Sequence, residues 1–530
     1  MNLSGLNKQG ESRQFKEDKM LKNKNIYLLL IFILFISLFA NPVFAQEDSL
    51  RIAIPGRAQT LDPAYLQRVL SDWPVMNSIF NGLVKYEAET FEVVPDLAED
   101  WEISADGKEI TFELKEGIYF HKGYGEFRAE DVKFSFERII AEDANSPEAQ
   151  SFSNLEKVEI IDRYTVKLIL TEPMGRLFTS TLPFNAGLIV SKNAVEEMGR
   201  QEFSSNPVGT GPYVFEQWDV NNNITLQKNE NYFEQTAEYE EVRFMPMSDP
   251  TTQELALQSG EIDIGQLTLD NFDRISQMDE FEAEIYPDLA IQYVAFNTNS
   301  EALSSRKLRE ALSYIIDPEE ILIGAFAGKA ERAYSILLED MNGYWEAPAF
   351  NLEDVGEDYV WDLLAEAGYP DGEGLELEYV TDATEERRLI GALIQDQLAN
   401  FNIELSIEAL EVGPKIDRWQ EGSYDITYAR FTNTVDPGHN FQWNLSEQIG
   451  SWNLFHWSNE EYDKLWQEAE NSLDSDMRAE NYQKMQQLMA QDSIGIWVTH
   501  GVKTPAWNRE VEPVFSPDGV ILSWLTTKKQ

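Results

Sequence analysis

The stretch that decides the fold is residues 94–139, which read VPDLAEDWEISADGKEITFELKEGIYFHKGYGEFRAEDVKFSFERI. Within it, apolar and polar side chains alternate over residues 109–115, and the apolar ones are Ile110, Phe112 and Leu114. A period of two is typical of a strand with one buried face, so this segment predicts a half-buried strand. A turn signal, Ala105-Asp106-Gly107, comes directly before it.

The second half of the stretch has the spacing of a helix. From Ala129 onward, apolar or small side chains share one helical face, and these are Val132, Ser135, Phe136 and Ile139. This periodicity predicts a helix from Ala129 to about Ile139. No group in the stretch has the spacing of a catalytic site.

Strand and helix patterns alternate along the rest of the chain. Strands are predicted at 50–54, at 158–170 as a pair around a turn, and at 214–218, 261–264, 293–297, 375–380, 424–437 and 494–498. Helices are predicted at 69–80, 192–199, 250–260, 308–315, 361–367, 389–398, 462–469 and 482–490, with Ser458–Glu461 as a capping box for the one at 462. This alternation favours α/β domains over a helix bundle or a sandwich.

Composition bounds the class of protein. The chain has 530 residues, enough for two or three domains, and 43% of them are hydrophobic and 12% aromatic, which argues against disorder. Residues 1–45 hold six Lys or Arg and three Asp or Glu, so the remaining chain has 36 basic and 90 acidic side chains and a charge of −54. That charge excludes a nucleic-acid or anionic-membrane surface. The acidic residues are dispersed, so we interpret them as a solvated surface suited to high salt rather than as a cation site.

The N-terminus has the pattern of a secretory signal peptide. Ile26–Ala40 is a fifteen-residue apolar run that follows several lysines and precedes Val43-Phe44-Ala45. It is shorter than the ~20 residues that span a bilayer, so we expect a signal peptide at residues 1–45, cleaved after Ala45, rather than an uncleaved anchor. Met20 is an alternative start. The chain has no cysteine to carry a disulfide or a lipid, which favours a free periplasmic protein.

The sequence lacks the constellations expected of an enzyme. It has no cysteine nucleophile and no G-x-S-x-G motif. Gly209-x-Gly211 lacks the third glycine and the lysine of a phosphate loop, and we interpret it as a turn. The four histidines lack the paired spacing of a metal site; they are His121, His439, His456 and His500. We therefore expect no enzymatic activity, no cofactor and no metal site.

Short motifs follow one another along the chain in a fixed order. The opening stretch contains PDLAE-W, DG-TF-L, FH-G and AEDV-FS-ER. Outside it lie TLDP (60–63), NGL (81–83), PVGTGPY (207–213), GEID (260–263), FN followed by R-x-A-L-x-x-x-I-D (296–317) and AEAGYPDG (365–372). In this order the motifs resemble extracellular solute-binding proteins of family 5, the peptide and oligopeptide class. These are the capture subunits of ABC importers, and the resemblance runs from about Thr60 to about Val511.

The resemblance implies a fold and a division into domains. The fold is an α/β periplasmic-binding-protein fold of type II (cluster C), with two large lobes, an inserted smaller domain and a ligand cleft between the lobes. A discontinuous domain I would comprise residues 46–82, 206–289 and 498–530. Domain II would be inserted as residues 83–205 and contribute little to ligand contact, and domain III would span residues 290–497. Closure of the lobes on a ligand would present the protein to a membrane permease.

The resemblance also points to the loop at residues 429–437. In peptide-binding members, an aspartate in the loop after a Y-D strand meets the amino terminus of the ligand, because a buried cation needs a charge partner. Here the aspartate position falls on Asn433 or Thr434, depending on the end from which the loop is aligned. The tryptophan position of the family falls on Phe431 or Arg430. Neither Asn433 nor Thr434 can neutralise an ammonium.

Several residues are candidates for ligand contact. We expect Arg430, Phe431, Thr432, Asn433 and Thr434 to line the cleft, and Asp436 could replace the missing aspartate if the loop bends differently. Approximate alignment adds Phe152, Trp497 and His500. A cluster of four tryptophans offers stacking surface, although each one alone is more typical of a core: Trp419, Trp443, Trp452 and Trp457.

These observations favour an extracytoplasmic protein that captures di- or oligopeptides for an ABC importer. The alternatives are the same role for an oligosaccharide or another small solute, since aromatic faces and neutral amides suit a sugar, and a sensor or chaperone on the same fold. Nickel has little support because histidines are few. The expected partners are the ligand and the permease and ATPase subunits, without nucleic acid, and we expect a monomer.

Overall fold

The computed structural model describes residues 48–66, 69–88, 90–220, 222–432, 434–516 and 519–529. Met1–Ser49 and Leu50–Gln530 form two separate units, and the sheets and helices described below belong to the second, apart from the first residue of β1. The predicted signal peptide at residues 1–45, its cleavage after Ala45 and the alternative start at Met20 lie outside the described residues.

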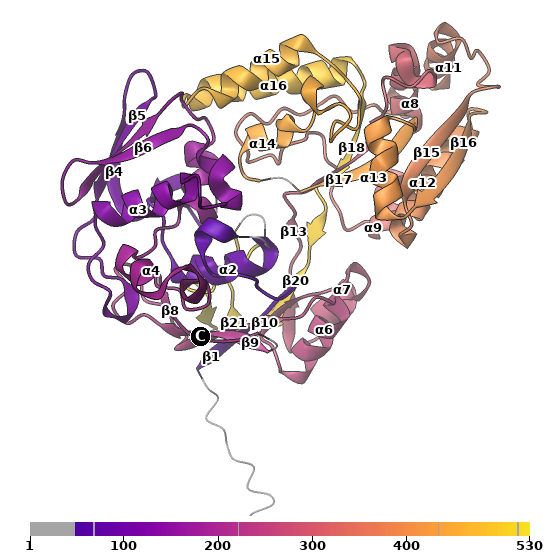
Figure 1. Ribbon diagram of the computed structural model, residues 1–530. Coiled ribbons are helices and arrows are strands. Elements are labelled where there is room, and N and C mark those ends of the chain that lie inside the picture. Colours follow the sequence, from indigo (N-terminus) through magenta and orange to yellow (C-terminus); the bar gives the residue numbers. More distant parts are fainter. Residues whose placement is uncertain are drawn as a thin grey trace, which may run out of the picture. The chain divides into compact units, whose positions relative to one another are not determined.

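One sheet collects strands from early, middle and late parts of the described chain, in the order β12-β20-β11-β1-β10-β9-β8 (Figure 1). Strand β1 pairs in parallel with β11, whereas β8, β9 and β10 form an antiparallel meander. The strands are β1 (Ser49–Ile54), β8 (Tyr213–Asp219), β9 (Asn223–Lys228), β10 (Glu241–Pro246), β11 (Ile264–Gln266), β12 (Phe281–Ala283) and β20 (Pro505–Asn508).

The stretch at residues 94–139 builds part of a second sheet and the helix beside it. The strands of this antiparallel sheet are, in spatial order, β4 (Ala98–Ile103), β5 (Glu109–Leu114), β7 (Thr165–Leu170) and β6 (Leu155–Ile160). Strand β5 buries Ile110, Phe112 and Leu114, as its alternation predicts. Helix α3 (Ala129–Ile140) buries its predicted apolar face and packs on β6.

A third sheet has both parallel and antiparallel neighbours. Its spatial order is β16 (Glu404–Leu410), β15 (Glu376–Asp382), β17 (Ile426–Phe431), β14 (Ile291–Phe296) and β18 (Gly495–Thr499). Strand β15 runs parallel to β16 and β17, and β14 runs antiparallel to β17 and β18. Strand β14 is buried along its whole length because helices cover the sheet, among them α12 (Glu385–Ala399), α9 (Pro318–Phe326) and α8 (Arg306–Ile315) (Figure 1).

The remaining elements are short strand pairs and helices. The pairs are β2 (Val84–Tyr86) with β3 (Val93–Pro95), β13 (Tyr286–Pro287) with β19 (Val502–Lys503), and β21 (Val511–Glu512) with β22 (Thr527–Lys528). The other α-helices are α2 (Val69–Ile79), α4 (Lys192–Met198), α5 (Arg200–Phe203), α6 (Pro250–Ser259), α7 (Leu269–Ser276), α10 (Leu352–Val355), α11 (Glu357–Glu366), α13 (Val412–Glu421), α14 (Pro437–Gln442), α15 (Glu460–Glu470) and α16 (Ser475–Gln491). Short helical turns are η1 (Pro63–Tyr65), η2 (His121–Gly123), η3 (Pro147–Phe152), η4 (Leu177–Thr181, a π-helix), η5 (Asn185–Gly187), η6 (Ala302–Ser304) and η7 (Ser446–Gln448).

Several of the sequence motifs meet in space and hold the elements together. Asn81 of NGL donates to Asp96 of PDLAE-W at 3.0 Å and accepts from Thr210 of PVGTGPY at 3.0 Å. Asp62 of TLDP pairs with Arg138 of AEDV-FS-ER, and the aspartate is fully buried. Buried polar groups of this kind are costly unless they are satisfied, so the motifs fix which segments must meet.

The Gly209-x-Gly211 pair is explained by a close approach of backbones. A Cβ atom at Gly209 would lie 2.1 Å from the Ile79 carbonyl oxygen, and one at Gly211 would lie 2.5 Å from the Ile79 carbonyl carbon. Neither glycine has a positive φ. Their carbonyls accept from the backbone N–H and the ring Nε2 of His121, each at 2.9 Å. The glycines therefore let two motifs pack on the end of α2, which a turn alone would not require.

Most predicted elements are present, although the helices predicted at 361–367 and 482–490 begin earlier, at Glu357 and Ser475. Three further differences concern two strands and a helix cap. The strand predicted at 261–264 begins only at Ile264, because Glu261 and Ile262 complete the end of α6 through bonds to Ala256. Asn459 caps α15 in place of Ser458, by accepting from the N–H groups of Glu461 and Tyr462. Strand β17 ends at Phe431 rather than continuing to Pro437.

The α/β fold class is confirmed. Each of the three large sheets draws its strands from one predicted domain, except for the last two residues of β18. The three-domain division itself stays a prediction.

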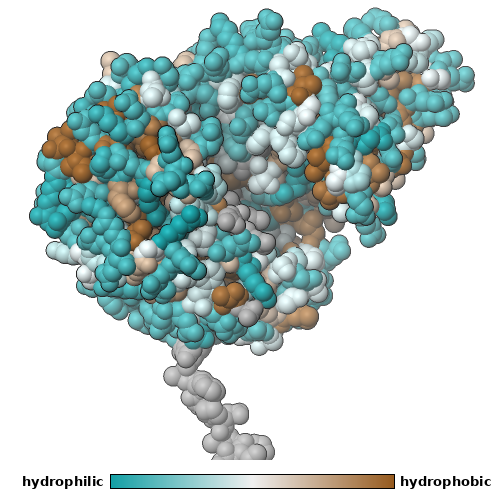
Figure 2. All heavy atoms as spheres, viewed as in Figure 1, coloured by the Kyte–Doolittle hydropathy of each residue, from teal (hydrophilic) through white to brown (hydrophobic). Residues whose placement is uncertain are grey.

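Hydrophilic residues cover most of the face shown in Figure 2, and hydrophobic residues occur there in small separate groups. Scattered exposed hydrophobic residues of this kind are normal on a protein surface. The adaptation to high salt stays a prediction.

Candidate functional site

A cavity of about 710 Å³ lies among segments that are far apart in the sequence. Its walls come from α2 and β2, from residues 148–151 of η3, from residues 176–188, from the loop before α14 and from residues 516–525. A volume of this size lies within the range of small-molecule binding sites. This cavity is the candidate functional site.

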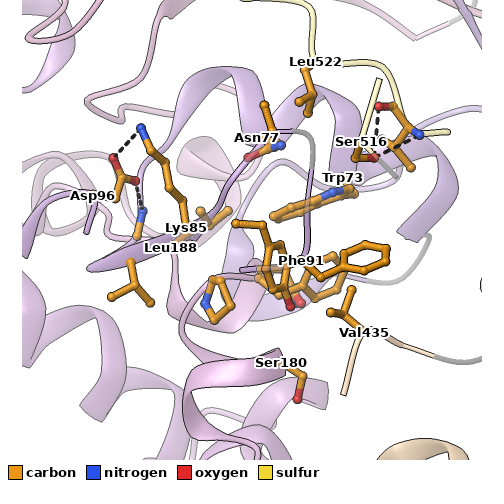
Figure 3. Close-up of a pocket in the computed structure, with 18 of the residues that line it drawn as sticks. Trp73, Asn77, Lys85, Phe91, Asp96, Ser180, Leu188, Val435, Ser516 and Leu522 are labelled. Atoms are coloured by element: carbon orange, nitrogen blue, oxygen red, sulfur yellow. Dashed lines mark hydrogen bonds and ion pairs between the residues drawn. The ribbon is translucent and has the colours of Figure 1, made fainter. Parts of the chain in front are cut away.

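Aromatic side chains form a large part of the wall. The rings of Trp73 and Phe184 are 4.2 Å apart between centroids, and those of Tyr86 and Phe91 are 6.4 Å apart and nearly perpendicular. In Figure 3, Trp73 and Phe91 lie between Lys85 and Asp96 on one side and Ser516 on the other. Rings of this kind provide apolar contact area and stacking faces for a ligand.

One end of the cavity is polar and already paired. Asp96 accepts from the Gly82 N–H at 3.1 Å as well as from Asn81, and Lys85 Nζ lies 3.9 Å from it (Figure 3). The same Nζ donates to Glu234 at 2.6 Å. Burial raises the pKa of Asp96 to about 6, although Lys85 acts in the opposite direction. These groups pair with one another through hydrogen bonds and ion pairs, which stabilise the wall.

A different part of the wall contains Arg176 and His439. Burial lowers the pKa of His439 to about 4, and nearby Arg176 adds to this effect, so the imidazole is neutral at pH 7. The amide of Gln442 lies 2.7 Å from Nδ1 of His439, which therefore accepts and leaves the ring proton on Nε2. Arg176 donates to the Gln150 carbonyl at 3.0 Å. Among the described residues, no carboxylate lies within 4 Å of its guanidinium.

The predicted loop contributes part of the wall. Thr432, Thr434 and Val435 line the cavity, and the hydroxyl of Thr434 is buried without a hydrogen-bond partner among the described residues. A hydroxyl in that position can bond a ligand. Asn433 lies outside the described residues. The loop is thus placed at the cavity, as the sequence predicts, while the assignment of its individual contacts stays a prediction.

Arg430 and Phe431 do not line the cavity themselves. Arg430 pairs with Asp288, which does line it, and donates to the Thr432 hydroxyl at 3.1 Å. Phe431 packs against the rings of Tyr293, Trp443 and Trp452. Both side chains therefore support the loop from behind.

Asp436 is fully buried and is occupied by protein groups. It accepts from Arg478 Nη2 at 2.8 Å, from the Thr179 hydroxyl and, as the cap of α14, from the His439 N–H at 3.2 Å. Burial would raise the pKa of Asp436, but Arg478 and these hydrogen bonds outweigh it and hold the pKa below its usual value. In this structure Asp436 is thus engaged by protein groups and does not line the cavity, and its role as a replacement for the missing aspartate stays a prediction.

The three candidates from approximate alignment also lie away from the cavity. Phe152 is 1% exposed and packs on Phe136 in the core. Trp497 packs edge-on against Tyr293 and Phe455. His500 is half-buried beside the backbone of Ser335 and Leu337, and its partial burial lowers its pKa to about 4. None of the three lines the cavity in this structure, since each is held by packing within the fold.

The tryptophan cluster divides between core and surface. Trp419 and Trp457 are buried and donate to the Thr427 hydroxyl and the Asp492 carboxylate. Trp443 and Trp452 flank Phe431, and neither lines the cavity. The tryptophans that do line it are Trp73 and Trp524, which the sequence did not single out.

The predicted domain II contributes more to the cavity than expected. Glu148, Arg176, Phe184 and Leu188 all come from residues 83–205 and all line the cavity. No sequence motif marks these four residues, because η3, η4 and η5 come together only once this part of the chain has folded. The segment thus contributes to the wall of this cavity, while its small share in ligand contact stays a prediction.

No group of three or more His, Cys, Asp or Glu side chains in the described part of the chain could hold a metal ion. Over the same residues, no helix is long and apolar enough to cross a membrane.

Described proteins and solved structures are similar to the chain over most of its length. The probable D,D-dipeptide-binding periplasmic protein DdpA of Escherichia coli (strain K12) is 26% identical, with 89% of this chain and 92% of that protein covered. The structure of HbpA2 from Haemophilus parasuis superposes with a TM-score of 0.81 at 26% identity, covering 91% and 100%. A dipeptide-binding protein from Pseudoalteromonas sp. SM9913, in complex with Met-Leu, gives 0.68 at 25% identity, covering 91% and 100%.

The family follows from a match to the chain itself. The family model described as bacterial extracellular solute-binding proteins, family 5 middle, matches residues 92–452, which is more than half of the chain. That range contains the stretch at residues 94–139, the cavity loop and many of the motifs. The chain therefore belongs to the bacterial extracellular solute-binding proteins of family 5.

Proposed function

We propose that this protein captures short peptides outside the cytoplasm and delivers them to the permease of an ABC importer. Members of its family are transport binding proteins, and two of the relatives above are described as binding dipeptides. We further propose that residues 1–45 are removed on export, that the chain acts as a monomer and that its lobes close on the ligand.

The chemistry of the cavity wall is the observation that carries the peptide assignment. Aromatic and aliphatic side chains provide most of the wall, which suits apolar peptide side chains. Charged groups of both signs also line it; the acidic ones are Glu87, Asp96, Glu148, Glu234 and Asp288, and the basic ones are Lys85, Arg176 and Lys503. A zwitterionic peptide can form charge-assisted hydrogen bonds with groups of both signs, which a neutral oligosaccharide, able only to hydrogen-bond them through its hydroxyls, cannot match in charge.

A thermal-unfolding panel tests the assignment. Di- to pentapeptides at about 100 times their Kd should stabilise the protein by roughly 2.7 kcal/mol. With an unfolding entropy near 2 cal/mol/K per residue, this corresponds to a rise in Tm of about 2–3 °C. The control compounds are α- and β-linked oligosaccharides of similar mass. Stabilisation by the oligosaccharides and by none of the peptides would contradict the proposal.

A further inference from the structure

A free peptide would bring an ammonium group into the cavity, where a carboxylate would be its charge partner, and the predicted loop does not supply one. Of the five acidic residues in the described wall, three are already paired. Asp96 and Glu234 share Lys85, and Asp288 is paired with Arg430 and lies 3.8 Å from Lys503. Glu87 is exposed, where water and salt weaken an ion pair. Glu148 is therefore the one acidic residue of the described wall that is neither paired with a basic side chain nor exposed.

Glu148 lies in a half-buried position on η3 and lines the cavity. Its carboxylate accepts from the Ser151 hydroxyl at 3.0 Å, and among the described residues no Lys, Arg or His lies within 4 Å of it. Burial raises its pKa, and the neighbouring Asn185 and Ser151 side chains act in the opposite direction. The Ser151 hydroxyl helps to hold the ionised form, but no basic side chain in the described part of the chain lies close enough to form an ion pair with it.

A ligand cation at this place would make a charge-assisted hydrogen bond with a partly desolvated carboxylate. Such bonds are stronger than neutral ones, and desolvation strengthens them further. Ser151 and Asn185 also line the cavity and provide polar groups near the same carboxylate. Phe184 precedes Asn185 and faces Trp73, so an apolar first side chain would find an aromatic surface close by.

Resting on the proposed function, we propose that Glu148 binds the free amino terminus of the peptide. It thereby takes the role that the loop at residues 429–437 cannot fill, since Asp436 is held by Arg478 and neither Asn433 nor Thr434 is acidic. In this arrangement the wall built from residues 148–188 binds the amino group of the peptide. The loop contributes hydrogen bonds to the peptide from the neutral hydroxyls of Thr432 and Thr434.

Titration calorimetry with blocked and free peptides tests the proposal. The probes are Met-Leu and Leu-Leu-Leu with their N-acetyl forms, and the proteins are wild type, Glu148→Gln and Glu142→Gln. Glu142 is exposed and outside the cavity wall, so its variant is a matched control. The wild type and the control should bind the free peptides at least tenfold more tightly than the N-acetyl forms.

In Glu148→Gln the affinity for the free peptides should fall about 10- to 100-fold, while that for the N-acetyl forms stays unchanged, so that the preference disappears. A folded Glu148→Gln that keeps the preference overturns the inference and leaves the proposed function standing. The inference is also overturned, with the proposed function left standing, if the wild type binds free and N-acetyl peptides equally tightly. A wild type that binds none of these peptides contradicts the proposed function, and the inference with it. If Glu148→Gln does not fold, Glu148→Ala replaces it, and an unchanged preference for the free over the N-acetyl peptides in that variant overturns the inference.

Discussion

Replacing Arg478 with methionine is expected to lower the free energy of unfolding by about 3–5 kcal/mol, because it leaves buried Asp436 without its cation. Arg478 is 3% exposed, and its guanidinium also donates to the Gly175 carbonyl at 2.6 Å and to the Tyr482 hydroxyl at 2.8 Å. Denaturation by urea, followed by far-UV circular dichroism, measures the loss.

Lys484→Met is the matched control for this variant. Lys484 lies on the same helix, α16, and its side chain is exposed and 3.9 Å from Glu480. An exposed pair of this kind contributes at most a few tenths of a kcal/mol. A loss below about 1 kcal/mol for Arg478→Met would show that the buried cluster does not hold the loop before α14 in place.

Replacing Glu470 with glutamine is expected to remove a pH-dependent loss of stability that grows above pH 5. Glu470 lies 3.8 Å from Arg478 Nη2, one of its carboxylate oxygens has no hydrogen-bond partner among the described residues, and burial together with Asp436 raises its pKa to about 7. Arg478 and Arg176 act in the opposite direction.

The sign follows from the direction of that shift. Below about pH 4.5 the carboxyl is protonated in both the folded and the unfolded state, so its contribution to stability is complete. As the pH rises through about 7, the unfolded state ionises first and the contribution is lost, at roughly 1.4 kcal/mol per pKa unit, or about 3 kcal/mol in total. Buried His121 and half-buried His439 and His500 have lowered pKa values, so their contributions to stability are lost in the opposite direction, as the pH falls below about 6.5.

The comparison of wild type with Glu470→Gln isolates the contribution of this one carboxyl. Their difference in unfolding free energy, measured by urea denaturation at intervals from pH 5 to pH 8, should shift steadily in favour of the variant. Glu480→Gln is the control, since Glu480 is exposed on α16. Parallel curves for wild type and Glu470→Gln would contradict the raised pKa.

The sequence predicts the elements of this fold well because the signals are local. The alternation in β5 and the helical face of α3 appear in the sequence as they appear in the structure. The motifs carry a second kind of signal, since Asn81, Asp96 and Thr210 come from three of them and bond to one another. Errors occur where a neighbouring element takes over a segment, as α6 does with Glu261 and Ile262.

The cavity is harder to predict because it is assembled from distant segments. The loop at residues 429–437 could be located because a strand and a recognisable motif precede it. The sequence gives no signal that α2, η3 and η5 meet, so it could not identify three of the residues that line the cavity: Trp73, Glu148 and Phe184. The sequence does not show the tertiary packing that turns three of the predicted site residues away from the cavity, namely Phe152, Trp497 and His500.

A crystal structure of the protein with the most stabilising peptide of the panel tests peptide capture most directly. The predicted result is density for one peptide in the cavity, between the Trp73–Phe184 wall and the loop that carries Thr432 and Thr434, with its amino group at Glu148. A peptide bound elsewhere on the protein, with the cavity empty, would contradict capture at this site.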